Sequence, residues 1–423
     1  MSAELRIPLD IQDVEIKSTE ITQDNQIIIE IESTLGTTEC GICGQEIRCT
    51  YGHGDERTLR HLPVLGMETY IKFRARRGQC HSCDNEPTTT QVVRWYKERS
   101  PHTDAYDKWL MKQLINTTIE DVSMRENIGY DAVVGALDRQ IATKVNWSEI
   151  DELGTVGIDE IAQHKGRNSY TAIVSCRLKN GQKHVLAVLP DRKKKTVKAF
   201  LETIPKHLRR TIIDITTDIW DGYLNAAAEF VDENDEVNST IVIDRFHVAK
   251  NYRDAFDKLR KKEFKRLKSD LSDGDYAQVC KGMLWILRKN HHDLTPDDRA
   301  RLRTLFRHSP LMHQAYTFRE ELTAIFNRRY TVDQAKIAIL AWIRKIEASS
   351  CNCYNSFIKT LRRYWTFILN YFERRVSSGF VEGLNNKIKT IKRRCYGISK
   401  PSTLFQRIWL DLQGRRRFFL STP

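Results

Sequence analysis

Apolar and polar residues repeat with different periods along this chain, and the changes of period divide it into four stretches. Residues 11–34 alternate around a turn at 23–25, which predicts a small β unit. Residues 104–146 show helical periodicity, and an α/β pattern begins near residue 155. Three β-rich runs followed by strands alternating with helices predict a mixed sheet with helices packed on it. In this region we expect strands at 156–161, 170–178, 184–189, 211–218 and 241–244, and helices at 196–208 and 224–230.

Residues 248–376 show no convincing strand pattern, so we predict an all-α block there. Its start is strongly basic, because ten Lys or Arg residues stand against three acids between Arg245 and Lys268. Such a run is either a solvated helix face or a phosphate-binding surface. The interleaved aromatic residues, such as Trp285, are expected in the core. We interpret Cys351 and Cys353 as structural, because their spacing does not suit a zinc turn.

Size and charge limit the classes of protein that this chain can represent. With 423 residues it is too long for one simple core, and two to four folding units are expected. The formal net charge of +13 indicates an anionic partner, nucleic acid before any other. No apolar run approaches the roughly eighteen residues of a membrane span, and the start lacks the pattern of a signal peptide. We therefore expect no membrane partner and a cytoplasmic, nucleoid-associated location.

Two Cys-x-x-Cys pairs stand in the β-rich part of the chain, Cys40 with Cys43 and Cys80 with Cys83. In a reducing compartment such pairs indicate metal, because each turn directs two thiolates at one tetrahedral ion. We expect a structural Zn²⁺ without a catalytic role, since four cysteines leave no open position for a substrate.

The loop between the two pairs contains other candidate ligands. One alternative is therefore a site in which a histidine replaces a cysteine, and another is a set of unmetallated pairs. The competing ligands are Cys49, His53 and His61. A basic edge for DNA binding is expected just before the second pair, at Arg74, Arg76 and Arg77.

Two short helices around a turn are predicted between residues 101 and 150. Ile119 and Val122 mark the first helix, and Val133 and Leu137 mark the second, with a Gly-bearing turn at 127–129. A helix-turn-helix that reads DNA requires this arrangement. A plain helical connector would show the same pattern.

Several apolar strands end in a carboxylate. Asp159 interrupts the first strand of the α/β region, Asp218 ends a later one, and Asp244 ends the next. Burying a carboxylate unpaired is costly, so each must be neutralised, paired or bound to a cation. Asp214 and Asp221 are weaker candidates for the same role, and a turn or ion pair is the simpler explanation for any one of them.

A further carboxylate, Glu382, stands near the start of a predicted helix, with Asn385 three positions on. Its simpler explanation is a first-turn glutamate that favours the helix dipole. Ten Lys or Arg residues and one acid follow Glu382, which suits phosphate chemistry. DNA contacts are expected from the nearest of these, Lys387, Lys389, Lys392, Arg393 and Arg394.

Three such carboxylates suffice for phosphodiester chemistry. Hydrolysis or transfer to a 3′ hydroxyl requires one ion to activate the attacking oxygen and another to stabilise the leaving oxygen. Two Mg²⁺, or Mn²⁺ in their place, are held by a few carboxylates together with substrate phosphate and water. Asp159, Asp218 and Glu382 can converge in space although they are far apart in sequence.

The ordered set of motifs resembles the insertion-sequence transposases of the ISL3 type over nearly the whole chain. The motifs are the two cysteine pairs, the predicted helix-turn-helix, G-I-D-E, T-T-D-I-W-D-G-Y, V-I-D-R-F-H-V and F-V-E-G-L-N-N-K-I-K-T-I-K-R. The resemblance implies a ribonuclease-H-like catalytic core interrupted by an α-helical insertion, and an N-terminal region that recognises terminal inverted repeats. Asp159, Asp218 and Glu382 resemble the DDE catalytic acids, with Asp244 as the rival of Asp218.

In this interpretation Asp244, His247 and Asn385 are supporting residues. The expected segments are a β-rich zinc-binding module (1–100), a helix-turn-helix region (101–150), the first part of the core (151–247), the α-helical insertion (248–376) and the last part of the core with a basic tail (377–423). The expected activity is Mg²⁺-dependent cleavage of transposon ends and their joining to target DNA, by a homodimer or larger assembly. The alternatives are a nuclease without strand transfer and a zinc-containing DNA-binding regulator.

Overall fold

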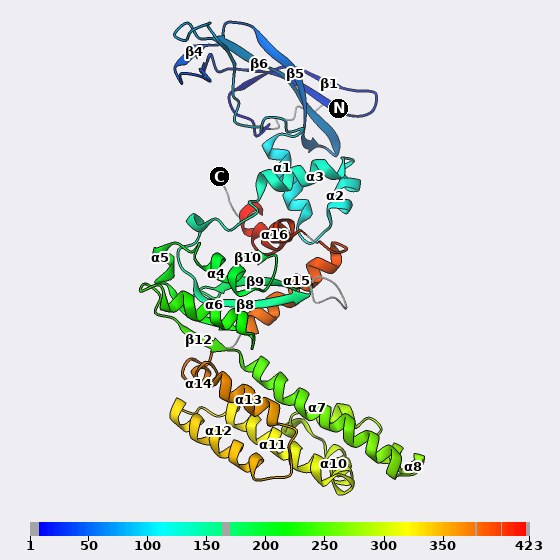
Figure 1. The fold of residues 1–423 in the computed structure, drawn as a ribbon. Helices are drawn as coiled ribbons and strands as arrows, with labels where there is room; N and C mark the ends of the chain where they lie inside the picture. The colour runs from blue at the N-terminus through cyan, green and yellow to red at the C-terminus, as the bar shows by residue number, and fades with distance from the viewer. Residues whose placement is uncertain (1–7, 163–169, 377–378, 399, 420–423) are drawn as a thin grey trace. The chain divides into compact units, whose positions relative to one another are not determined.

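The computed structural model describes residues 8–162, 170–376, 379–398 and 400–419 (Figure 1). The chain divides into two compact units, one of residues 1–144 and 390–423 and the other of residues 145–389. The expected last part of the core, 377–423, is thus split between the two units. The loop 163–169, between two predicted strands, lies outside the described residues. Among the described helices, none combines the length and apolar character needed to cross a membrane.

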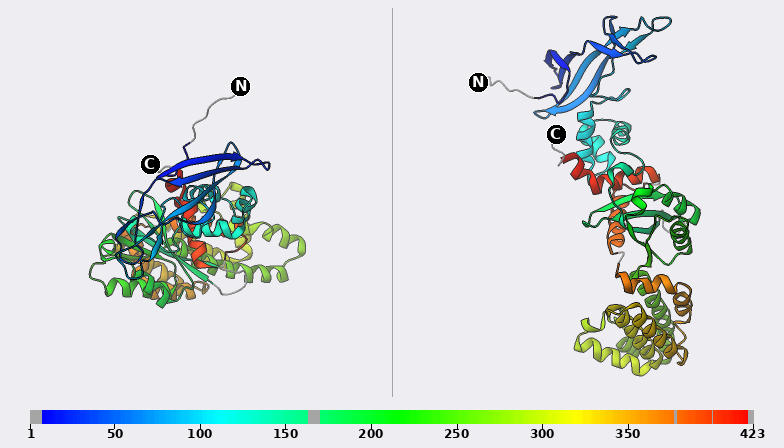
Figure 2. Two further views of the ribbon diagram at one scale, coloured as in Figure 1. Left: turned by 90° about the horizontal axis from the view of Figure 1, so that it is seen from above. Right: turned by 90° about the vertical axis from the view of Figure 1, so that its left-hand side faces the viewer.

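The first unit begins with the predicted β structure, a five-stranded sheet with a small hairpin beside it (Figure 2). The sheet order is β1-β2-β6-β5, with β7 paired to β6, and β3 pairs with β4 in the hairpin. Asn25 adopts a left-handed conformation in the predicted turn between β1 and β2. The strands are β1 (Val14–Ile21), β2 (Ile27–Ser33), β3 (Thr37–Glu39), β4 (Glu46–Arg48), β5 (His53–Val64), β6 (Met67–Gln79) and β7 (Thr88–Thr90).

Four helices complete the core of the first unit. Thr118 caps α2 in a capping box with Asp121, and Asn127 ends this helix in a left-handed conformation, so local chemistry fixes the predicted turn. The helix α16 packs on α1, where the Arg407 guanidinium donates to the carbonyls of Leu114 (3.0 Å) and Thr117 (2.6 Å). The helices are α1 (Asp104–Leu114), α2 (Ile119–Glu126), α3 (Tyr130–Gln140) and α16 (Pro401–Phe419).

The second unit is built on a mixed five-stranded sheet in the order β10-β9-β8-β11-β12. The first three strands along the chain are antiparallel, whereas β11 and β12 run parallel to β8. The strands are β8 (Gly154–Ala162), β9 (Tyr170–Arg177), β10 (Lys183–Leu189), β11 (Ile212–Thr217) and β12 (Thr240–Ile243).

Three helices accompany this sheet, and α6 lies along β11 and β12. The single helix predicted at 196–208 is two helices, because Pro205 lacks the N–H that would continue the first one and disfavours helical geometry at the residue before it. The helices are α4 (Lys194–Leu201), α5 (Lys206–Arg209) and α6 (Asp221–Asp232).

Residues 248–376 are all described, and their regular elements are helices, as predicted. They share one continuous core with the sheet. Trp285 was expected in that core but is 68% exposed, because Met283, Ile286 and Leu287 form the buried side of its short helix. The helices are α7 (Arg245–Asp270), α8 (Asp273–Cys280), α9 (Met283–Arg288), α10 (Pro296–His308), α11 (Pro310–Asn327), α12 (Val332–Glu347), α13 (Asn355–Arg363) and α14 (Trp365–Arg374), followed by α15 (Gly379–Arg394).

Candidate functional site

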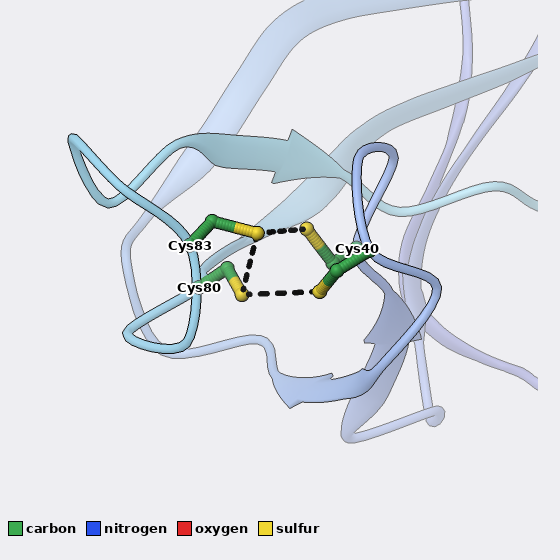
Figure 3. Close-up of side chains that lie close together, drawn as sticks. Cys40, Cys80 and Cys83 are labelled. Carbon is green, nitrogen blue, oxygen red and sulfur yellow. Dashed lines mark hydrogen bonds between the residues drawn. The ribbon is translucent and has the colours of Figure 1, made fainter.

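The four predicted zinc ligands converge in the first unit. Their ligand atoms all lie within 4.8 Å of one another, and they form the only such group of His, Cys, Asp or Glu side chains among the described residues. The Sγ atoms are 3.9 Å apart for Cys40 and Cys83, and 3.7 Å apart for both Cys43–Cys80 and Cys80–Cys83 (Figure 3). Four thiolates bound to one Zn²⁺ at about 2.3 Å would be about 3.8 Å apart, so the geometry fits a tetrahedral ion.

The local backbone favours the thiolate form of one of these ligands, Cys40. The backbone N–H groups of Cys43 and Ile42 donate to the Cys40 sulfur, and they lower the pKa of that thiol to about 6. A thiolate is the form that binds zinc. None of the competing ligands belongs to the cluster: the buried His61 instead lies 2.9 Å from the Thr103 hydroxyl. The site is therefore a four-cysteine structural zinc site.

In the second unit, three aspartates stand at equivalent positions on the neighbouring parallel strands β8, β11 and β12. Thr217 pairs with Ile158 of β8 on one side and with Ile243 of β12 on the other. The next residue on each strand is an aspartate, so Asp159, Asp218 and Asp244 come level at one edge of the sheet. The sheet register thus gathers carboxylates whose proximity is not evident from their sequence separation.

The helix α15 lies directly on β8 and carries Asn385 to Asp159. The Nδ2 of Asn385 donates to Oδ2 of Asp159 at 2.6 Å. Two residues earlier on β8, a Cβ at Gly157 would lie 2.4 Å from a methyl carbon of Val381, so the absence of a side chain permits the close approach. From Val381 to Asn385 the helix rises by about 6 Å, and from Gly157 to Asp159 the strand advances by about the same distance. The two contacts between α15 and β8 therefore match in spacing.

Burial makes the first two aspartates reluctant to ionise. Desolvation raises the pKa of Asp159, against the opposing effects of the Glu160 backbone N–H, His247, Lys389 and Asn385. Desolvation, with the nearby charges of Asp159 and Glu160, raises the pKa of Asp218 to about 7. A bound cation would stabilise the charged forms of these neighbouring, desolvated carboxylates.

Three neighbours of these acids were not predicted from the sequence. Glu160 accepts a hydrogen bond from Arg192 at 2.9 Å, and the Arg192 charge opposes the rise in the pKa of Asp218. The Tyr223 hydroxyl is buried without a hydrogen-bond partner, as is Oδ1 of Asp218. The doublet Asp159-Glu160 and the basic turn before α4 were visible in the sequence, but their meeting depends on the fold.

Glu382 occupies a different position from the aspartate pair. Its side chain is exposed and lines a cavity of about 280 Å³ together with Asp244, Tyr252 and Arg253. Among the described residues, Asp159, Asp218 and Glu382 do not form a group within 4.8 Å. Asn385, on the same helix as Glu382, reaches Asp159, and Glu382 itself shares its cavity with Asp244.

The weaker candidates have structural partners. Asp214 is buried and accepts a hydrogen bond from Arg374 at 2.9 Å. Asp221 accepts from Arg363 and from the Tyr364 hydroxyl, both at 2.5 Å. These contacts attach the sheet and α6 to the last helices of the insertion. A structural role therefore accounts for both acids, and no catalytic role is needed.

The expected DNA-binding side chains differ in their exposure and pairing. In the zinc module, Arg74 and Arg76 pair with glutamates at 3.2 and 2.7 Å, and Arg77 donates to Thr88. Lys387, Lys389 and Arg393 of α15 are exposed. Burial lowers the pKa of Lys392, and Arg394 forms an ion pair with Asp411.

The exposed charges of α2 and α3 are mostly acidic. Arg139 of α3 donates two hydrogen bonds to the carboxylate of the buried Asp107, from Nε at 2.6 Å and from Nη2 at 2.9 Å. Arg125 is then the exposed basic residue of the two helices. The exposed acids are Glu120, Asp121, Asp131 and Asp138. The predicted helices and turn are present, but their charge does not favour contact with phosphates.

Comparisons with known proteins cover both units. A family model described as "Transposase" matches residues 156–408, and one described as "zinc-finger of transposase IS204/IS1001/IS1096/IS1165" matches residues 36–83. The transposase for insertion sequence element IS1001 of Bordetella parapertussis is 26% identical, over 92% of both chains. The transposase for element IS1557 of Mycobacterium tuberculosis is 22% identical, over 96% of this chain and 93% of the relative.

Proposed function

Because this chain belongs to the ISL3-type family of DDE transposases, we propose that it binds the ends of its own insertion sequence, cleaves them and joins the 3′ ends to target DNA. The family implies a DDE-type polynucleotidyl transferase that uses a divalent metal such as Mg²⁺. The observation that carries the assignment of the site is the alignment of Asp159 and Asp218 on adjacent parallel strands, with α15 attached to Asp159 through Asn385.

The core of the second unit is ribonuclease-H-like in this proposal. Its strand order, with three antiparallel strands followed by two parallel ones, supports this fold, and the helical block between β12 and α15 is the insertion. In this core the second acid follows the fourth strand and the third stands on the helix after the insertion. That order favours Asp218 over Asp244 and assigns the third position to Glu382.

Asp159, Asp218 and Glu382 would hold the divalent ions. When bound, two such ions activate the attacking oxygen and stabilise the leaving oxygen. The buried, unpartnered Oδ1 of Asp218 and the unpartnered Oδ1 of Asn385 fit this role, because each offers an oxygen to a cation. Asn385 orients Asp159, and both Asn385 and His247 favour the ionised form of that carboxyl group. Asp244 is a supporting residue that lines the same cavity as Glu382.

The first unit would supply recognition of the element's ends. Its zinc site folds the cysteine-bearing loops, and the three-helix region with the basic C-terminal helix completes a DNA-binding body. The exposed Arg415, Arg416 and Arg417 of α16 are better suited to phosphates than the acidic faces of α2 and α3. Pairing two ends requires two copies of the protein, so we infer a homodimer or larger assembly on DNA.

Replacement of Asp159 by Asn tests the proposed catalytic role. The expected variant binds DNA that carries the element's terminal inverted repeat with unchanged affinity, but neither cleaves it nor joins pre-cleaved ends to a target. Asp235→Asn, at an exposed aspartate between α6 and β12, is the matched control and should retain both activities. Full activity of Asp159→Asn would exclude this site.

The same assay separates the two competing functions. A nuclease without strand transfer would cut the ends in its wild-type form and never join them. A DNA-binding regulator would bind the repeat and show no metal-dependent cleavage with any variant.

A further inference from the structure

A stack of two aromatic rings and one guanidinium lies beside the proposed catalytic acids. The guanidinium carbon of Arg192 is 3.9 Å from the centre of the Trp220 ring and 4.2 Å from that of Tyr170. The same guanidinium donates to Glu160, the neighbour of Asp159 in the chain. The stack is thereby attached to β8 at the catalytic edge of the sheet, and Trp220 stands two residues after Asp218.

The Trp220 indole is held in place by the backbone around it. A Cβ at Gly222 would lie 2.7 Å from the indole Nε1 and 3.1 Å from the carbonyl oxygen of Arg192, so only glycine leaves room for the ring. Despite these contacts, 39% of the Trp220 surface is exposed. An aromatic side chain stabilises a fold mainly through burial. Packing alone therefore does not explain why the Trp220 ring is fixed in position and yet partly exposed.

A cavity of about 550 Å³ opens beside the stack. Tyr170, Arg192 and Trp220 line it together with the basic residues Lys193 and Lys194. Lys194 pairs with Glu229, and the strongly exposed Lys193 forms a longer ion pair with Asp191, at 3.7 Å. Planar groups and a cation therefore border one hollow.

We propose that this cavity binds one unstacked nucleobase of the DNA strand next to the scissile phosphate, with the base stacked on the Trp220 ring and the adjoining phosphate held by Lys193. Rings and guanidinium planes stack on any base, and lysine suits the phosphate that accompanies it. The inference rests on the proposed function, because it presumes that DNA occupies the site of Asp159 and Asp218. It adds a strand-positioning site that the catalytic acids alone do not provide.

A purely structural role for the stack is the competing explanation. In that case Trp220 only holds Arg192 against Glu160, and its loss would weaken every DNA complex alike. A nucleobase site makes a different prediction, since the effect of losing the ring must depend on the presence of one particular base.

A double-mutant cycle between the protein and the DNA decides between these explanations. The probe is a pre-cleaved duplex end of the element in which the nucleotides flanking the cleavage position are made abasic one at a time, with binding measured in Mg²⁺-free buffer. Trp220→Ala should weaken binding of the intact duplex by about fivefold to 150-fold, the range for one base stacked on an aromatic ring. It should leave binding of one abasic duplex unchanged.

Two further variants keep the test independent of misfolding. Trp220→Phe retains a ring and should retain most of the discrimination between intact and abasic DNA. Gly222→Ala keeps the tryptophan but displaces its indole, so it should behave as Trp220→Ala does. Equal weakening of all duplexes by Trp220→Ala, or no weakening at all, would overturn the proposal. Failure of the wild-type protein to bind the element's ends would instead overturn the proposed function.

Discussion

Asn385 donates its side-chain amide to Oδ2 of Asp159 at 2.6 Å, across 226 positions of sequence. Asn385 is only 3% exposed, and its own oxygen is unpartnered. The contact orients the first of the proposed catalytic acids from the helix that also carries Glu382. Because it favours the charged form of a desolvated carboxyl group, it bears directly on the pH at which that acid can bind a cation.

Asn385→Ala should therefore move the acid limb of the cleavage profile to higher pH. Without the donated hydrogen bond, the pKa of Asp159 rises further, so a higher pH is needed to ionise it. Near neutral pH the cleavage rate should fall on the order of tenfold, the effect of losing a hydrogen bond of about 1.4 kcal/mol. Cleavage rates measured between pH 6 and pH 9 give the profile. The exposed neighbour Asn386, replaced by Ala, is the control, and identical profiles for both variants would argue against this role.

Gly157→Ala should detach α15 from β8. The added methyl group would meet Val381 at 2.4 Å and Phe380 at 3.2 Å, and both side chains are buried. Overpacking of this kind costs about 1–3 kcal/mol, and here it also displaces Glu382 and Asn385. Cleavage and thermal unfolding should both suffer. Gly383→Ala, on the same helix with no neighbour within 4 Å, should be neutral or slightly stabilising. A Gly157→Ala protein with normal cleavage would show that the close approach is unimportant.

Asp218→Asn should stabilise the metal-free protein at pH 8. The folded-state pKa of Asp218 is about 7, above the ordinary value of 3.8, so the folded state binds a proton more tightly than the unfolded state does. Stability is therefore lost as the pH rises from about 4 to about 7, and the loss persists at higher pH. The amide removes this cost, so the gain in melting temperature should be largest at pH 8 and vanish towards pH 4.

Asp214→Asn is the counterpart of this variant, four residues earlier on the same strand. It breaks the ion pair of a buried carboxylate with Arg374, so it should destabilise the protein at pH 8 by about 1–3 kcal/mol. Melting curves of both variants in the presence of a chelator test the pair. A destabilising Asp218→Asn would contradict the assignment of this acid as a strained, cation-seeking group.

Cys40→Ser should abolish zinc binding and unfold the loops around the cluster. Three remaining thiols cannot complete the tetrahedral site, and structural zinc contributes its binding energy directly to folding. Zinc content measured on the purified protein should fall from about one ion per chain to nearly none, with faster proteolysis of residues 36–83. Cys49→Ser should keep its zinc, because this cysteine lies outside the cluster. Equal zinc content in both variants would refute the four-cysteine site.

The sequence was sufficient for features that depend on short-range chemistry. The spacing of the cysteine pairs predicted the zinc site, and the period of the apolar residues predicted the strands of the second unit and the helical character of residues 248–376. The Gly-bearing turn at 127–129 follows from a capping box and a left-handed Asn127. Each of these depends on residues close in sequence, where the favourable conformations are few.

Only the tertiary structure decided which of the many acidic side chains lie close together. The local pattern left Asp244 as a rival of Asp218 and Asp214 as a weaker one, but a buried ion pair holds Asp214, whereas the sheet register brings Asp218 beside Asp159. The stack of Arg192 on Trp220 and the packing of α16 on α1 likewise join distant segments. Such contacts depend on strand order, register and helix docking, and those are fixed by the burial of the whole core rather than by the residues at the site.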